Sequence, residues 1–135
     1  MFCIKTTDFW DKDCERTIRW DDHELNIDWQ LHLLGALKPY LSEKDKKAFE
    51  RVSQNAKLTR YGLDCYGYAL VAMGTADLVI EAGLSIYDIQ APACVIEAAG
   101  GIVTNWDGKP ARNGGRIVAA SNEKVHKNAL ELLNS

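Results

Sequence analysis

From residue 42 onward, apolar and polar positions follow the periods of helices and strands, whereas residues 1–30 show neither period. Ser42 followed by Asp45 resembles a capping box, with Asp in place of the usual Glu. The sequence therefore predicts that a helix begins after Ser42. Its apolar face consists of Ala48, Phe49 and Val52.

The next segments alternate between strand and helix. Residues 57–61 read as a short strand that Gly62 ends, and residues 64–73 as a helix. Gly74 follows this helix at the position where a left-handed backbone costs least. Residues 76–81 form an apolar strand whose last residue is the acidic Glu81.

A third helix is predicted between Asp88, which can cap its first turn, and the pair Gly100–Gly101, which ends it. Pro92 lies early enough in this helix to be tolerated. Helical spacing directs several of its apolar residues toward a core. These residues are Ile89, Ala93, Ile96 and, less regularly placed, Val95.

The chain ends in a hairpin and a helix. Residues 102–106 and 116–120 read as two strands, and Asp107–Gly108 is a turn signal after the first. Ser121 or Asn122 caps the last helix. The apolar face of that helix is Val125, Ala129, Leu132 and Leu133.

Helices that alternate with strands predict an α/β fold, a layered α/β/α domain in which helices cover the sheet. The closing hairpin predicts that the sheet is mixed rather than wholly parallel. We expect two regions: residues 38–135 as one compact domain, and residues 1–37 as a segment without a family match.

Composition and charge exclude several classes of function. The net charge of −3 disfavours binding to nucleic acid, which requires many Lys and Arg side chains. No apolar run reaches the length of about 20 residues needed to cross a bilayer, and no signal peptide is evident. We therefore expect a cytoplasmic protein. Charge is uneven, because residues 1–30 hold eight acids and four bases whereas residues 31–135 hold eleven and twelve.

The cysteine and histidine residues do not form a metal site by their spacing. Cys3, Cys14, Cys65 and Cys94 include no C-x-x-C pair, which favours free thiols. The three histidines are scattered and are expected to be surface or packing residues: His23, His32 and His126.

Three acids are candidates for chemistry because each follows or ends a predicted strand. Asp64, Glu81 and Asp88 would meet at the edge of the sheet where ligands usually bind. Such a cluster suits a divalent cation or an amine. Structural interpretations remain open for each, since Asp64 and Asp88 could only cap helices and Glu81 could be a solvated strand end.

Residues 87–101 resemble the second signature of the inositol monophosphatase superfamily, with Tyr87–Asp88–Ile89–Gln90–Ala91 leading to Glu97–Ala98–Ala99–Gly100–Gly101. Residues 58–84 are similar to the histidinol-phosphatase branch, which differs from inositol-specific members at Gly62–Leu63–Asp64–Cys65. The resemblance implies the fold of the C-terminal domain of these sugar phosphatases.

The resemblance also implies roles for individual residues. Asp88 would bind a catalytic Mg²⁺, and Glu81 would contact the part of the substrate that carries no phosphate. Asp64 would pair with the amine of histidinol, and Gly62 and Leu63 would line the same subsite. No residue of this chain is assigned a direct catalytic step.

The metal-binding motifs of the family are missing from this sequence. They are an upstream Glu and an Asp-Pro-x-Asp-Gly-Thr motif, and the acidic residues near the N-terminus lack the Pro and Gly-Thr that would match it. These acids are Asp11, Asp13, Asp21 and Asp22. One carboxylate at Asp88 cannot hold a cluster of Mg²⁺ ions.

The resemblance therefore implies a Mg²⁺-dependent phosphomonoesterase for L-histidinol phosphate, and the missing motifs predict that it is present as an incomplete C-terminal half that is inactive alone. We expect self-association or a complementary N-terminal chain, because a family fold cut at this point exposes core surface. Two alternatives remain open, a phosphatase for inositol or sugar phosphates and a non-catalytic binding or assembly module.

Overall fold

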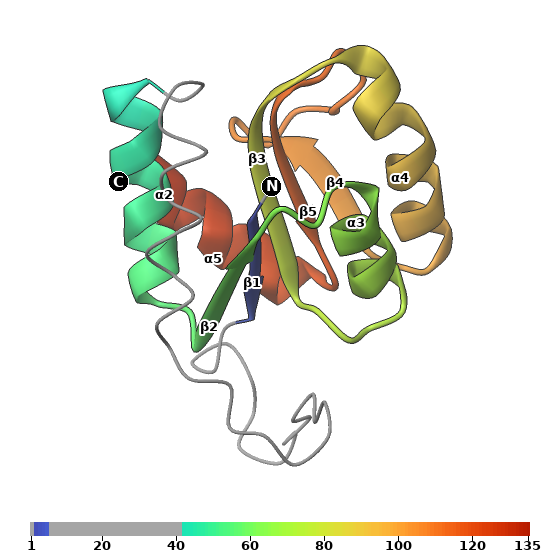
Figure 1. Cartoon of the computed structure of the whole chain (residues 1–135), viewed down its shortest axis with the longest axis horizontal. Coiled ribbons are helices and arrows are strands. Elements are labelled where there is room, and N and C mark those ends of the chain that lie inside the picture. The colour runs from blue at the N-terminus through green and yellow to red at the C-terminus, as the bar shows by residue number, and fades with distance from the viewer. Residues whose placement is uncertain (1, 6–41) are drawn as a thin grey trace.

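A computed structural model describes residues 2–5 and 42–135, which form an α/β/α sandwich (Figure 1). The predictions about residues 6–41 lie outside the described part of the chain. The elements, in chain order, are β1 (Phe2–Lys5), α2 (Glu43–Gln54), β2 (Leu58–Tyr61), α3 (Cys65–Ala72), β3 (Leu78–Leu84), α4 (Ile86–Ala98), β4 (Ile102–Asn105), β5 (Gly115–Ala120) and α5 (Glu123–Asn134).

The five strands lie in the order β2-β1-β3-β5-β4, and every pair of neighbours is antiparallel. The predicted mixed sheet is therefore wrong. The sequence does place β2, β3 and β4 in one common direction, because each is followed through a helix to the next. However, β1 lies between β2 and β3, and β5 lies between β3 and β4, so no two of these three strands are adjacent.

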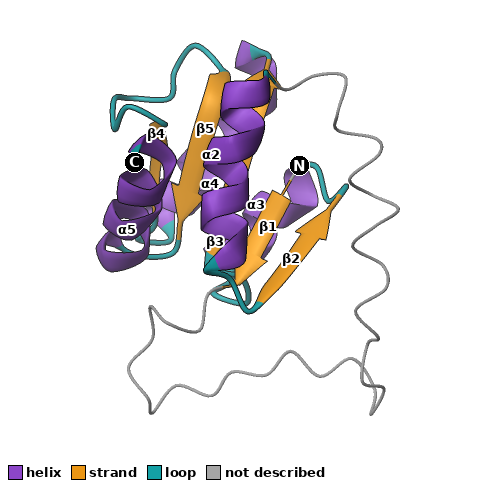
Figure 2. Cartoon of the chain, turned by 90° about the vertical axis from the view of Figure 1, so that its left-hand side faces the viewer, coloured by secondary structure: helices purple, strands orange, loops and turns teal. Residues whose placement is uncertain are grey.

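The two faces of the sheet bury two separate cores. Successive residues of β3 alternate between them, since Leu78 and Ile80 face α2 and α5 while Val79 faces α3 and α4. Figure 2 shows α2 in front of the sheet with α5 beside it. The α/β layered fold predicted from the sequence is confirmed.

Most of the predicted apolar faces are buried as expected. In α2 they are Ala48, Phe49 and Val52, and in α5 they are Val125, Ala129 and Leu133. In α4, Ile89 and Ile96 are buried, but Val95 is 55% exposed and the prediction that it faces the core is wrong. None of the described helices has the length and apolar character that a membrane span requires.

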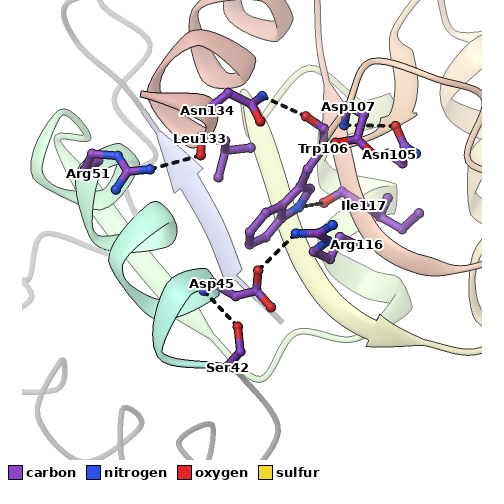
Figure 3. Close-up of polar contacts among 10 residues, drawn as sticks. All are labelled: Ser42, Asp45, Arg51, Asn105, Trp106, Asp107, Arg116, Ile117, Leu133 and Asn134. Atoms are coloured by element: carbon purple, nitrogen blue, oxygen red, sulfur yellow. Dashed lines mark hydrogen bonds and ion pairs between the residues drawn. The ribbon is translucent and has the colours of Figure 1, made fainter.

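Polar contacts join α2 to α5 and hold these two helices against the sheet (Figure 3). Arg51 of α2 donates to the carbonyl oxygens of Leu132 and Leu133 at 2.8 and 3.0 Å. The indole N–H of Trp106 donates to the carbonyl of Ile117 at 3.1 Å. Asp45 pairs with Arg116 at 3.2 Å, so it does not complete the predicted capping box, although Ser42 Oγ does accept from the Asp45 N–H.

Candidate functional site

The common direction of β2 and β3 brings two of the predicted acids to one edge of the sheet. Both strands are antiparallel to β1, so their carboxyl ends lie at the same edge. Asp64 follows the end of β2, and Glu81 is the middle residue of β3. Asp88 is in the first turn of α4, which begins directly after β3. The strand directions expected from the sequence therefore place the three acids at this common edge.

Asp64 has a strained backbone at the start of α3. Its φ of 46° and ψ of −140° make it the one residue other than glycine with a positive φ in the described part of the chain. Asp64 occupies the N-cap position, but its side chain makes no capping hydrogen bond. Helix capping therefore does not explain this carboxylate. Such strain costs about 1–3 kcal/mol and is often found at binding sites.

Glu81 is a buried carboxylate, with 7% of its surface exposed. The strand continues to Leu84, so the interpretation of Glu81 as a solvated strand end is wrong. The register shifts between Glu81 and Leu84. The hydroxyl of Tyr68 in α3 donates a hydrogen bond to Glu81 Oε2.

Burial and the acids at the sheet edge raise the pKa values of Glu81 and Tyr68. Burial raises the pKa of Glu81; the Tyr68 hydrogen bond opposes the rise, and the charge of Asp64 adds to it. Burial also raises the pKa of Tyr68, and the charges of Glu81 and Asp88 add to that rise. Tyr68 therefore lies within electrostatic reach of Glu81 and Asp88. Asp64 lies within electrostatic reach of Glu81. Sequence reasoning missed Tyr68, because nothing in an apolar helix shows which hydroxyl will face a buried carboxylate.

Asp88 occupies the third position of α4 rather than the predicted N-cap. The N-cap is Ser85, whose N–H donates to Asp88 Oδ2 at 2.8 Å. The prediction is wrong because the helix begins two residues before Asp88, at Ile86, where Ser85 and Asp88 form a capping box. Asp88 is exposed, so its carboxylate is accessible from solvent while one of its oxygens caps the helix.

The two neighbours of Asp64 in the predicted subsite differ. Gly62 has a φ of 72°, a conformation that glycine adopts without strain, and it is exposed. The side chain of Leu63 is partly buried against the core beneath α3 and α4. The carbonyl oxygen of Leu63 accepts from the N–H of Tyr66 at 3.0 Å, so both the side chain and the carbonyl of Leu63 have contacts within the fold.

A divalent cation finds only part of its ligands in the described residues. Within residues 2–5 and 42–135, no three His, Cys, Asp or Glu side chains come close enough together to hold a metal ion. Mg²⁺ is usually bound by one or two carboxylates together with phosphate oxygens and water. Asp88 fits one such ligand, and the donor set around it is incomplete.

A pocket of about 640 Å³ lies on the other side of α4, between this helix, β4 and the loop that follows β4. Its lining includes Glu97, Thr104 and Arg112, and none of the three acids at the sheet edge. This pocket is therefore separate from the sheet edge that carries the three acids.

The described histidine and cysteines do not add to this site. His126 is half-buried, and its Nε2 lies 2.7 Å from the hydroxyl of Thr104, so it is the packing residue that the sequence predicted. Burial lowers its pKa. Cys65 and Cys94 are free thiols, as predicted, and both are exposed.

The family model described as "Inositol monophosphatase family" matches residues 35–135. The chain is 45% identical over 110 residues to the bifunctional phosphatase IMPL2, chloroplastic, of Arabidopsis thaliana, covering 74% of this chain and 32% of the relative. It is 42% identical over 74 residues to the histidinol-phosphatase of Streptomyces coelicolor, covering 55% and 27%. The chain thus spans about a third of the length of these curated relatives.

A solved structure of an inositol monophosphatase from Zymomonas mobilis has a similar fold. The TM-score is 0.68 at 31% identity, and the match covers 71% of this chain and 39% of that chain.

The N-terminal segment matches a different family. The model described as "dTDP-4-dehydrorhamnose 3,5-epimerase" covers residues 1–51, and the epimerase of that name from Pseudomonas aeruginosa is 54% identical over 50 residues. That match covers 36% of this chain and 25% of the relative. This similarity corrects the expectation that residues 1–37 have no family match, since what those residues lack is the set of phosphatase motifs.

Proposed function

Because this chain belongs to the inositol monophosphatase family, we propose that it carries the substrate-recognition part of a phosphomonoesterase for L-histidinol phosphate. The supporting observation is the position of Asp64, Glu81 and Asp88 at one edge of the sheet. The similarity to proteins named histidinol-phosphatase supports the choice of substrate.

The charge of the site suits a cationic alcohol. Histidinol phosphate carries an ammonium and an imidazole, which can form charge-assisted hydrogen bonds with carboxylates. Asp64 is the acid we assign to the ammonium, because its side chain makes no capping bond and its backbone is strained. Glu81 is assigned to the same end of the substrate. An approaching cation would favour the ionised form of this buried carboxylate, whose pKa is raised by burial.

We assign one ligand of a catalytic Mg²⁺ to Asp88. The ion, when bound, would supply a Lewis acid that activates water and stabilises the leaving alkoxide. Its remaining ligands are expected from a part of the family fold that these residues do not contain. The proposed work of this chain is to bind and orient the alcohol, and we expect little phosphatase activity from the chain alone. We also propose that the chain acts in the cytoplasm.

The experiment is calorimetric titration of the full chain with L-histidinol phosphate in the presence of Mg²⁺. We expect binding that Asp64→Asn weakens at least about ten-fold, as loss of a charge-assisted bond of about 1.5–3 kcal/mol implies. Glu131→Gln, a change to an exposed acid on α5, is the control and should leave binding unaltered. Equal affinity in wild type and Asp64→Asn would contradict the assigned role of Asp64.

Titration with inositol 1-phosphate tests the main alternative. A polyol has no cation for Asp64, so tighter binding of this ester would favour the inositol phosphatase interpretation. Absence of binding to either ester, and to Mg²⁺ alone, would favour a non-catalytic module. That alternative is supported by the incomplete donor set around Asp88 among the described residues.

We also propose that a second polypeptide covers the outer surface of α3 and α4. The large hydrophobic side chains that are exposed in the described residues all belong to these helices or to the end of α3. They are Tyr66, Met73, Ile86, Tyr87 and Val95. In addition, α3 contains no charged residue. A second copy of this chain is the proposed partner, and a complementary N-terminal chain is the alternative; the molar mass in solution tests this.

A further inference from the structure

Strand β1 connects two parts of the sheet that do not otherwise meet. Phe2–Lys5 pairs with Leu58–Tyr61 of β2 on one side, and Phe2–Ile4 pairs with Leu78–Ile80 of β3 on the other. In the order β2-β1-β3-β5-β4, β2 is an edge strand whose hydrogen-bonded neighbour is β1 (Figure 1). The link within the sheet from β2 to β3 therefore passes through four residues near the N-terminus.

The three strands match different families. β2 and β3 lie in the region that matches the inositol monophosphatase model, residues 35–135. β1 lies outside that region and inside residues 1–51, which match the epimerase model. A strand from a segment similar to one family thus completes the sheet of another.

We propose that Phe2–Lys5 is a complementing strand, which the epimerase-like segment supplies in the same chain to the gap between β2 and β3. Such pairing uses main-chain hydrogen bonds, which do not require a particular sequence, so a segment of unrelated origin can supply it. Without β1, two rows of N–H and C=O groups in this part of the sheet lose their partners. Native proteins rarely leave such groups unpaired when they are buried, so the gap favours any strand that can fill it.

This strand is also a positioning element for the candidate site. Asp64 follows β2 after Tyr61, whereas Glu81 is part of β3. Pairing of both strands with β1 sets the distance and direction between these two acids. The pairing of β1 with β2 and β3 does not depend on which substrate the chain binds. An experiment on this pairing is therefore independent of the proposed function.

A disulfide tests the register directly in the full chain. Cys3 is the Cα partner of Arg60, and directly opposed residues of antiparallel strands lie about 4.5–5.5 Å apart at Cα, within the range of a disulfide. We expect the Arg60→Cys variant to form a disulfide between Cys3 and the introduced thiol within one chain under mild oxidation, identified by peptide mapping. The control is Thr59→Cys, whose neighbour in β1 is Ile4. A shift of one residue moves a side chain to the other face, so at least roughly ten-fold less cross-link with Cys3 is expected.

A proline substitution tests the contribution to the sheet. Ile4→Pro removes a backbone N–H from a central strand and should speed amide hydrogen exchange at Leu58–Tyr61 by about ten-fold or more, whereas Ile4→Val, which keeps the N–H, should not. Equal exchange in both variants would overturn the proposal. So would failure of the Arg60→Cys variant to cross-link with Cys3, or a cross-link that forms only between two chains.

Discussion

Glu81 has the most constrained environment of the three acids at the sheet edge. Its carboxylate is buried beneath α3 and accepts a hydrogen bond from Tyr68. Burial disfavours the ionised form, and a neighbouring acid, Asp64, disfavours it further. The pKa of Glu81 is therefore higher in the folded chain than its ordinary value of 4.5. A site that binds a cation can tolerate this cost when the ligand is present.

The raised pKa predicts how stability depends on pH. Between 4.5 and the raised pKa, the folded chain binds more protons at Glu81 than the unfolded chain does, so the free energy of unfolding falls as pH rises through this window. Glu81→Gln is neutral and can still accept from Tyr68, so it should remove this contribution. Denaturant titrations measure the free energy of unfolding of both chains and so check this pH dependence. They are run at several pH values from about 4 to about 8, the range that a raised carboxyl pKa can reach. Parallel pH profiles for the two chains would contradict the prediction.

At the scale of single elements, side chains at helix N-termini determine where the helices begin. Asn122 Oδ1 accepts from the Val125 N–H at 3.0 Å, and Ser42 Oγ accepts from the Asp45 N–H at 3.1 Å. Each bond satisfies a backbone donor that the helix itself cannot. The sequence predicted the Ser42 cap, and Ser121 or Asn122 as the cap of the last helix, because Ser and Asn side chains directly before an apolar helical period can accept from the first-turn N–H groups.

Loss of the α5 cap should destabilise the whole chain. Asn122→Ala removes the bond to Val125 and should lower the free energy of unfolding by about 1 kcal/mol, within a range of roughly 0.5–2 kcal/mol. Asn122→Asp keeps an acceptor in the same position and serves as the control. Urea titrations at about pH 7, where the introduced carboxylate is ionised, compare the two variants with the unsubstituted chain. A loss of equal size in both variants would show that the cap bond is not responsible.

At the scale of the whole molecule, the two helical layers differ in the surface they present to solvent. α2 and α5 are amphipathic, and their outer faces carry charged side chains such as Lys47 and Glu131. The layer of α3 and α4 exposes Tyr87 and Val95 at 75% and 55%. Contiguous exposed apolar surface marks an interaction site in many proteins.

We therefore expect the chain, with a mass of 15.1 kDa, to have twice that mass in solution at micromolar concentration. Val95→Glu places a charge on the exposed side of the C-terminal half of α4. It should shift the equilibrium toward monomer by about ten-fold or more, since an unpaired charge in an apolar interface costs several kcal/mol. Lys127→Glu on α5 is the control. Light scattering after size exclusion gives the mass, and a monomer for the unsubstituted chain would rule out self-association.

The amino-acid sequence by itself determined the elements from residue 42 onward, the apolar faces of α2 and α5, and the placement of Asp64, Glu81 and Asp88 toward one edge of the sheet. These features depend on local periodicity, on capping residues and on the direction of strands joined through helices, all of which are encoded over short distances.

Only the tertiary structure decided which strands are neighbours, where Tyr68 donates its hydrogen bond and which residue caps α4. The insertion of Phe2–Lys5 between β2 and β3 is the clearest case. Strand pairing joins backbone groups that are distant in the chain, and it depends on packing against cross-strand neighbours that the local sequence does not reveal. Phe2–Lys5 is only four residues long and lies in a stretch of sequence without helical or strand periodicity. The local sequence therefore does not indicate that this strand lies between β2 and β3.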